Sequence, residues 1–477
     1  MSTRDLIYLL PLLIVAGTAL LLMVFIAARR NHRSAAQLAA TGFAAALAAD
    51  LAMLPPRSIG TEQITPLIYL DPVSMVFWAL ILFAGLVVTL LAYHYLEKQN
   101  ERREEFYVLL LLGTAGAMTL AAASHFASFF LGLELLSVSL FAMAAYLRER
   151  PDALEAGVKY LLLAGTASAL LLFGAALIYA SCGSLGFGLN AISLMRPAWY
   201  FAGFVMIVAA LGFKLALAPF HWWTPDVYQG APAPVTAFIA TASKVAVVSL
   251  FLRLVDSVHL VQSNRELMMS AYAVMAVVSM FLGNLLALRQ DSVKRVLAYS
   301  SIAHFGYVLV FFLIPEPMGP QPILFYLIAY VVTTLAAFGV VTALSTGEDD
   351  ADDLALYRGL FWRRPFLAAV FTASLLSLAG IPLTAGFVGK VYIVAAGVQG
   401  RLWGVLLCLV AASVIGLFYY LRVIWTMLSS PEPDEAPALP ALPLLGGIVL
   451  ATLVLAIVWL GVYPNPILRL IDAASAF

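Results

Sequence analysis

The chain consists of long apolar runs separated by short stretches that hold proline, glycine or charged residues. An apolar run of about 17 residues or more can cross the roughly 30 Å hydrocarbon core of a bilayer as an α-helix. The pattern predicts about 14 such helices, near 6–28, 35–54, 72–97, 106–122, 125–147, 152–180, 198–219, 232–254, 266–287, 294–314, 321–345, 365–395, 401–428 and 441–463. The expected fold class is all-α, a polytopic membrane protein.

Composition supports this class and narrows the chemistry. Hydrophobic residues make up 63% of the 477 residues and charged residues 11%, whereas average proteins have about 45–50% and about 25%. The 26 basic residues are balanced by 26 acidic ones, which argues against a nucleic-acid surface. The two cysteines are too few for a four-thiolate iron–sulfur cluster or for a zinc site, so we do not expect this chain to carry electrons.

Basic residues at the helix ends predict the orientation. With the N-terminus outside, the inner helix ends carry roughly twice as many Lys and Arg as the outer ends, as the positive-inside rule requires. We therefore expect both termini outside. The first apolar run is too long for a secretion-signal core and is followed, not preceded, by arginines, so we expect it to be retained as a helix. The acidic connection 347–364 and the proline-rich connection 429–440 are expected to be solvated linkers.

Five ionisable residues lie inside the apolar runs: Glu134, Lys159, Lys214, Lys244 and Lys390. Glu134, the only carboxylate that we place deep within a helix, lies about 14 Å along it and Lys244 about 18 Å along its own. A charge at that depth costs at least about 2.5–3.5 kcal/mol. Lysine releases its proton when desolvated and arginine does not, so these lysines indicate proton carriers. Structural ion pairing is the alternative, but one glutamate cannot pair with four lysines.

Helix breakers stand beside two of these lysines. Pro219 follows Lys214, and Pro382 precedes Lys390. Proline interrupts helical hydrogen bonds, and irregular backbone at membrane depth persists only where it is buried or lines a water cavity. A lone proline is usually just a kink, but corresponding breaks in two halves are typical of inverted repeats. We expect discontinuous helices 7 and 12 within four parts: three helices in 1–105, a five-helix repeat in 106–254, its inverted copy in 255–428 and a last helix in 429–477.

Polar side chains also mark the helix at 294–314, which corresponds to the Glu134 helix in the other repeat. They are Tyr299, Ser300, Ser301, His304 and Tyr307. A histidine on an apolar helix is more often a packing residue, but one that faces a lysine row is a reasonable proton relay.

The inner face offers a place for proton uptake. Lys159 lies about 10 Å from the inner end of its helix. Asp226 and His221, which are predicted near the same face, could form a funnel with it, although a capping or loop hydrogen bond explains Asp226 equally well.

Several segments are long and unusual in composition. They are FLGLELLSVSLF, LGFKLALAPFHWWTPDVYQGAPAPV, TASKVAVV, LAYSSIAHFGY and LLSLAGIPLTAGFVGK. Over essentially its whole length, the chain resembles the antiporter-like membrane subunits of type I NADH:quinone oxidoreductase (complex I) and their relatives in Mrp-type cation/proton antiporters and membrane-bound hydrogenases.

The resemblance implies a subunit that conducts protons across the bacterial inner membrane, driven by quinone reduction elsewhere in the complex. It matches Glu134 to a glutamate that pairs with the helix 7 lysine, here Lys214, and matches Lys159, Lys244 and Lys390 to the lysines of helices 6, 8 and 12. The proton would pass from Lys214 to Lys244 and then, through water, Tyr299, Ser300 and His304, to Lys390.

The same resemblance implies that this chain binds no cofactor. Flavin mononucleotide, iron–sulfur clusters and quinone would belong to partner subunits. The expected partners are sister antiporter-like subunits, small membrane subunits and the lipid bilayer.

Three other functions remain open at this point: a subunit of an Mrp-type antiporter or a membrane-bound hydrogenase, a secondary transporter with a solute pocket, and a scaffold without transport. Co-purification with quinone-reductase subunits would distinguish the first, and uptake assays the second. A scaffold would tolerate methionine in place of all four lysines.

Overall fold

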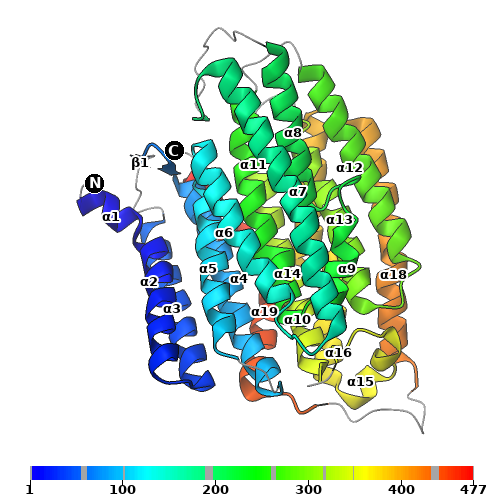
Figure 1. The fold of residues 1–477 in the computed structure, drawn as a ribbon. Coiled ribbons are helices and arrows are strands. Elements are labelled where there is room, and N and C mark those ends of the chain that lie inside the picture. The colour runs from blue at the N-terminus through cyan, green and yellow to red at the C-terminus, as the bar shows by residue number, and fades with distance from the viewer. Residues whose placement is uncertain are drawn as a thin grey trace.

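The computed structural model describes residues 3–54, 62–99, 103–187, 197–258, 265–314, 319–346, 349–430 and 440–475. Its helices run side by side through the height of the molecule (Figure 1). In these ranges, 11 helices are long and apolar enough to cross a membrane, and three apolar helices are shorter. The predicted class, an all-α polytopic membrane protein, is confirmed, while the count of 14 spans and the inverted repeat stay predictions.

The first part of the chain forms four helices and a small hairpin. The helices are α1 (Thr3–Tyr8), α2 (Leu10–Ala28), α3 (His32–Met53) and α4 (Pro72–Glu97), and the antiparallel hairpin joins β1 (Glu62–Thr65) to β2 (Ile68–Leu70). The hairpin was not predicted. The side chains of Asn31 and Asp71 cap the first turns of α3 and α4, which explains where these helices begin.

The middle of the chain follows as α5 (Glu105–Ala121), α6 (Phe126–Ala144), α7 (Pro151–Cys182), α8 (Pro197–Leu215), α9 (Trp223–Gly230), α10 (Ala233–Phe238), the π-helical turn η1 (Ile239–Ser243) and α11 (Lys244–Val258). The last part comprises α12 (Arg265–Ala287), α13 (Val293–Phe311), α14 (Gln321–Leu344), the 3-10 turn η3 (Leu354–Tyr357), α15 (Leu360–Arg363), α16 (Pro365–Ala379), α17 (Ala385–Gln399), α18 (Trp403–Leu428), α19 (Leu444–Val462) and α20 (Asn465–Ser475).

Two predicted helices are interrupted where the prolines indicated. After α8, Ala216 has a φ of 61° and regular helix resumes only at α9. Between α16 and α17, Gly380 has a φ of 83°. A Cβ on Gly380 would lie 2.7 Å from Cδ of Lys390, so this position needs glycine both for its backbone conformation and for the lysine stem that passes over it.

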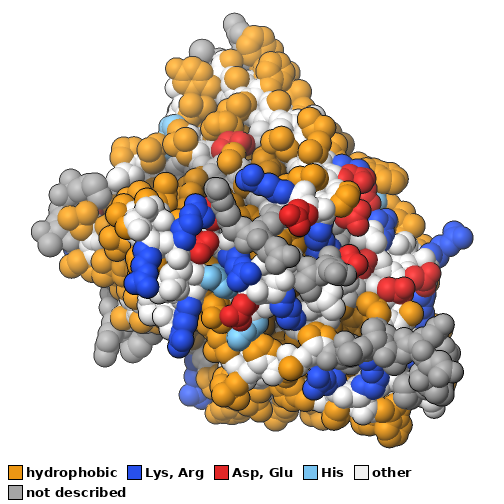
Figure 2. Space-filling view, turned by 60° about the horizontal axis from the view of Figure 1, so that its bottom comes forward, with side chains coloured by type: hydrophobic (Ala, Val, Ile, Leu, Met, Phe, Trp, Pro, Cys, Tyr) orange, Lys and Arg blue, Asp and Glu red, His pale blue; other side chains and the backbone are white. Residues whose placement is uncertain are grey.

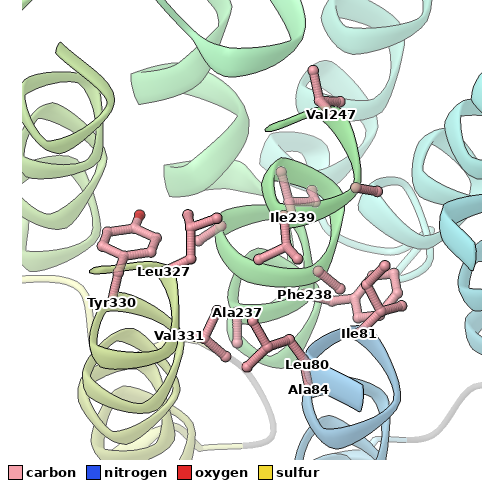
Figure 3. Packing of buried hydrophobic residues seen from close by; sticks show 14 of the residues in the cluster. Leu80, Ile81, Ala84, Ala237, Phe238, Ile239, Val247, Leu327, Tyr330 and Val331 are labelled. Carbon is pink, nitrogen blue, oxygen red and sulfur yellow. The ribbon is translucent and has the colours of Figure 1, made fainter. Parts of the chain in front are cut away.

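The centre of the bundle is formed by α4, α14 and the continuous rod α10–η1–α11. Figure 3 shows Leu80 and Ile81 of α4, Phe238 and Ile239 of the rod and Leu327 of α14 packed together. The rod and α14 are almost entirely buried. The outer helices α2, α3, α7, α12, α18 and α19 bury only about a third of their apolar windows, so most of their apolar side chains face the surroundings of the chain.

One end of the bundle gathers charged side chains, as Figure 2 shows from below. The acidic connection after α14 belongs to this end, and our prediction of a solvated linker is wrong for it. The side chain of Asp350 is 2% exposed; it accepts a hydrogen bond from Nζ of Lys294 at 2.6 Å and lies 3.2 Å from Nη1 of Arg150. Burial alone would raise the pKa of Asp350, but these two cations hold that pKa below its usual value. The partners come from distant helices, which a local composition cannot reveal.

Most of the proline-rich connection 429–440 lies outside the described residues. The marks for both chain ends stand at the upper end of the bundle, opposite the charged end (Figure 1). The two ends of the chain thus lie toward the same end of the bundle.

Candidate functional site

Lys214 lies near the end of α8, directly before the first helix break. Its side chain is 3% exposed, and its Nζ donates to Oγ of Ser137 on α6 at 2.6 Å. Glu134, one turn earlier on α6, accepts a hydrogen bond from Ser168 of α7. Glu134 and Lys214 thus occupy the same region and act on each other electrostatically, but each ends on a serine instead of forming the direct ion pair that the resemblance implied.

Aromatic rings enclose Lys214 on its other side. Its Nζ lies 6.0 Å from the ring centroid of Phe141 and 5.7 Å from that of Tyr160. Tyr160 in turn stacks on Trp223, with centroids 4.7 Å apart, and Trp223 donates to the carbonyl of Phe213 at 2.8 Å. These contacts hold α9 against α8 just beyond the break.

Lys159 faces an aqueous pocket at the charged end. The pocket has a volume of about 180 Å³ and is lined by Asp152, Glu155, Ala156, Lys159, Asp226, Gln229 and Gly230. Nζ of Lys159 lies 2.7 Å from both Glu155 and Asp226, and Asp226 also binds Arg295 of α13 at 2.8 Å. The two cations hold the pKa of Asp226 below its usual value against a partial burial that would raise it. The structure therefore brings Lys159 and Asp226 together.

His221, the other residue of the predicted funnel, does not line this pocket. It is 2% exposed and stacks on Trp222 in the break between α8 and α9. Its Nδ1 has no hydrogen-bond partner in the described part of the chain.

Lys244 is completely buried at the point where η1 passes into α11. Its Nζ donates to Oγ of Ser301 at 2.7 Å and lies 4.5 Å from the ring centroid of Phe305. Ser301 is also hydrogen-bonded to the hydroxyl of Tyr330 on α14, at 2.7 Å. No carboxylate forms an ion pair with Lys244 among the described residues. Short π-helical segments occur frequently at functional sites, and this one orients the lysine toward α13.

His304 lies one turn after Ser301 on α13 and is surrounded by tyrosines. Its Nδ1 is 2.6 Å from the hydroxyl of Tyr326, and its Nε2 is 3.4 Å from that of Tyr420. The Tyr420 hydroxyl is also 2.5 Å from Oγ of Ser300. Ser300 and His304 are therefore in one hydrogen-bonded network, as predicted, whereas the structure does not bring the Tyr299 hydroxyl into it.

Lys390 lies on α17, just after the second helix break. Its Nζ donates to the carbonyl of Ala379 and to Oγ of Ser413, both at 2.8 Å, and lies 5.3 Å from the ring centroid of Tyr307. Ala379 is the last residue of α16, so the cation binds the negative end of a half-helix. The break between α16 and α17 thus exposes the backbone carbonyl that binds Lys390.

Sequence reasoning singled out Ser301 among the polar residues of its helix but missed two other hydroxyl partners of these lysines, Ser137 and Ser413. It also missed Tyr326, Tyr330 and Tyr420, which contact Ser300, Ser301 or His304. Ser137 carried a signal, since it stands three residues after Glu134 and so shares its helix face. Asp50 of α3 was also missed, because it stands near a predicted helix end; it is fully buried and neither of its carboxylate oxygens has a partner in the described residues.

Comparisons with known proteins give a consistent result. A family model described as "NADH:quinone oxidoreductase/Mrp antiporter, TM" matches residues 123–416. The chain is 47% identical over 484 residues to NADH-quinone oxidoreductase subunit N of Methylococcus capsulatus, covering 100% of this chain and 96% of that protein.

Solved structures agree in fold. A chain in respiratory complex I from Thermus thermophilus with bound aureothin has a TM-score of 0.84 at 33% identity, covering 97% of this chain and 99% of that one. A chain in the Mrp complex from Dietzia sp. DQ12-45-1b has a TM-score of 0.86 at 21% identity, covering 100% and 97%, which shows a shared fold.

Proposed function

Because the chain belongs to the family of NADH:quinone oxidoreductase/Mrp antiporter membrane subunits, we propose that it is subunit N of a bacterial NADH:quinone oxidoreductase and that it moves protons across the inner membrane. The observation that carries the proposal is the row Lys214, Lys244 and Lys390. Lys214 and Lys244 are buried and Lys390 is half-buried, and the hydrogen-bond partners of all three ammonium groups are hydroxyl or carbonyl oxygens.

The partners explain how such lysines move protons. Burial favours the neutral form of a lysine, and only a nearby negative charge or a set of hydrogen-bond acceptors offsets that cost. Glu134 supplies the negative charge near Lys214. The two groups do not form a locked ion pair, because Glu134 binds Ser168 and Lys214 binds Ser137. When Glu134 and Lys214 separate, the Lys214 proton is released toward Lys244.

The later part of the path uses groups that both accept and donate protons. Hydroxyls and imidazole have this capacity, whereas an ammonium only donates. From Lys244 the proton passes Ser301 and Tyr330, then the network of His304, and reaches Lys390. Ser300 belongs to this path through Tyr420, and Tyr299 is retained in the proposal as a neighbour of that network.

The charged end is proposed to be the inner, proton-uptake side, with both termini outside. The pocket at Lys159 and Asp226 supplies the water that uptake requires. The four-part division into 1–105, 106–254, 255–428 and 429–477 is part of this proposal, supported by the two breaks that each hold a lysine at the end of a half-helix.

Partner subunits are proposed to carry the flavin, the iron–sulfur clusters and the quinone. In the described residues, no group of three or more His, Cys, Asp and Glu is arranged to hold a metal ion. Subunit N is favoured over an Mrp-type subunit because the full-length identity to a subunit N is 47%, against 21% to the chain of the Mrp complex.

Two experiments test the proposal. Mass spectrometry of the complex purified through a tag on this chain identifies its partners, and absence of NADH-oxidising subunits would contradict assignment to the oxidoreductase. In reconstituted vesicles, Lys214→Met is expected to abolish most proton translocation driven by NADH, while the exposed control Arg33→Gln pumps normally. NADH oxidation by an artificial acceptor should be retained in both. Normal pumping by Lys214→Met would remove Lys214 from the path.

A further inference from the structure

Each of the lysines Lys214 and Lys244 has a tyrosine ring beside it. The ring of Tyr160 lies 5.7 Å from Nζ of Lys214, and the ring of Tyr228 lies 5.8 Å from Nζ of Lys244. Tyr160 comes from α7 and Tyr228 from α9, the short helix in the first break. Each lysine of this step therefore faces a tyrosine, and the two tyrosines act on each other electrostatically.

Tyr228 is held firmly by its surroundings. Its side chain is fully buried, its ring packs edge-on against Phe338 of α14 at 6.0 Å and Trp223 at 6.4 Å, and its backbone carbonyl accepts a hydrogen bond from Thr236 at 3.1 Å. These contacts involve the ring and the backbone. None of them uses the hydroxyl.

The hydroxyl of Tyr228 is itself without a hydrogen-bond partner in the described part of the chain. The polar groups that act on it are Ser301 and Tyr330 on the Lys244 side and Tyr160 on the Lys214 side. The Tyr228 hydroxyl is thus near enough to groups around both lysines to act on them, without a formed hydrogen bond to any of them. Because a buried hydroxyl without a partner is unfavourable, a packing role alone would be served better by phenylalanine.

We propose that the Tyr228 hydroxyl is the relay that carries protons from the Lys214 side to the Lys244 side, an inference that rests on the proposed function. In each transfer the phenol oxygen accepts one proton from the Tyr160 side while its own O–H proton passes to Ser301 and on to neutral Lys244. One proton leaves the Lys214 side, one arrives at Lys244, and Tyr228 is returned to its neutral form. Rotation of one C–O bond restores the starting orientation.

The test uses Tyr228→Phe in the intact complex reconstituted into vesicles. The variant keeps the ring contacts, so we expect normal assembly and a thermal midpoint equal to or above that of the parent. We expect NADH-driven proton translocation to fall to the level of Lys244→Met. The matched control is Tyr272→Phe, which removes the hydroxyl of a buried tyrosine that packs on Phe251 at 5.5 Å, far in sequence from the lysines; it should pump normally.

The outcomes separate the inference from the proposed function. Normal pumping by Tyr228→Phe, together with failure of Lys244→Met, overturns the relay role of Tyr228 alone. Normal pumping by both variants overturns the proposed function. A loss in Tyr228→Phe that is matched by Tyr272→Phe assigns the effect to packing and also overturns the relay.

A second measurement does not depend on removing the hydroxyl. Trifluorotyrosine at position 228 keeps the ring and the hydroxyl but makes the O–H group more acidic. A relay predicts that the alkaline limb of the pH profile of proton translocation moves to lower pH. An unchanged profile in an assembled complex overturns the proposal.

Discussion

Lys294 and Lys244 are both completely buried lysines on neighbouring elements, yet their surroundings differ in kind. Nζ of Lys294 is 2.6 Å from a carboxylate oxygen of Asp350 and 2.7 Å from the carbonyl of Ala231. Nζ of Lys244 meets the hydroxyl of Ser301 and the faces of two aromatic rings. Burial is the same, and the difference lies in whether a fixed negative charge is present.

This difference distinguishes a lysine whose charge holds the structure together from a lysine that can release its proton. A buried ion pair with additional hydrogen bonds fixes the proton on its lysine, because either partner left alone would be an uncompensated buried charge. A hydroxyl or an aromatic face stabilises the ammonium less and also tolerates the neutral amine. On this argument, the chemistry of its partners, and not its depth, decides whether a buried lysine can release its proton.

The largest effect is expected from Lys294→Met. It leaves Asp350 buried with Arg150 as its remaining cation and removes the donor to Ala231. Loss of one partner of a buried pair costs about 3–5 kcal/mol, so we expect little assembled complex on native gels. Lys244→Met is the matched control, since it removes a lysine without orphaning a carboxylate. Normal assembly of Lys294→Met would show that Lys294 contributes no more to the structure than Lys244.

Lys244→Arg tests the lysine that has no carboxylate partner among the described residues. Guanidinium keeps the positive charge but does not deprotonate in proteins. We expect an assembled complex whose NADH-driven proton translocation in vesicles is at least about tenfold lower, or about 1.4 kcal/mol in a rate-limiting barrier. Full translocation by this variant would show that Lys244 acts only through its field.

Asp350→Asn should alter the response to acid. The pKa of Asp350 is held below its usual value of 3.8, so its charge adds stability that is present above that value and is lost as the pH falls through the folded pKa. We expect the variant to unfold about 1–3 kcal/mol more easily at pH 7, less than Lys294→Met, because the asparagine oxygen can still accept a hydrogen bond from Lys294 or Tyr95. It should also lose less further stability than the parent between pH values of about 5 and about 3. Melting curves of the purified complex across this range measure both. Parallel curves for the two proteins would contradict the assignment.

The smallest effect is expected for Lys159→Gln at the aqueous pocket. The lysine is 41% exposed and its pairs with Glu155 and Asp226 are screened by solvent. We therefore expect a change in stability within about 1 kcal/mol and a reduction of proton translocation of about two- to threefold, since the neighbouring carboxylates still collect protons. Initial rates in vesicles check this, and a loss as deep as that of Lys244→Arg would make Lys159 an essential member of the proton path instead.

Periodicity and helix breakers were enough to predict the class of fold and to place Lys214, Lys244 and Lys390 inside it. A buried lysine is costly wherever it stands, so its position in an apolar run is informative by itself. Ser301 stood out with the other polar residues of its helix, but Ser413, Tyr326, Tyr330 and Tyr420 could not be predicted, because serine and tyrosine are unremarkable on membrane helices and which ones meet depends on how α13, α14 and α18 pack.

The structural role of Lys294, in contrast, could not be predicted from the sequence. It stands near the predicted start of a helix, where a basic residue is explained by topology alone, and its buried partner Asp350 lies in a segment whose composition indicated a solvated linker. The pairing joins segments 56 residues apart and is fixed by tertiary structure. A single sequence records neither the burial nor the pair.

The π-turn η1 has a consequence for aligning this chain with its relatives. An α-helix advances about 100° per residue, and a π-turn holds one residue more than the α-helical turn that it replaces. Matching Ile239–Ser243 without a gap to a regular helix therefore assigns Lys244 to the wrong helix face, by one residue. A one-residue gap placed within η1 restores the correct helix face. A lysine that is displaced by one position in the gapless alignment is therefore in register in space.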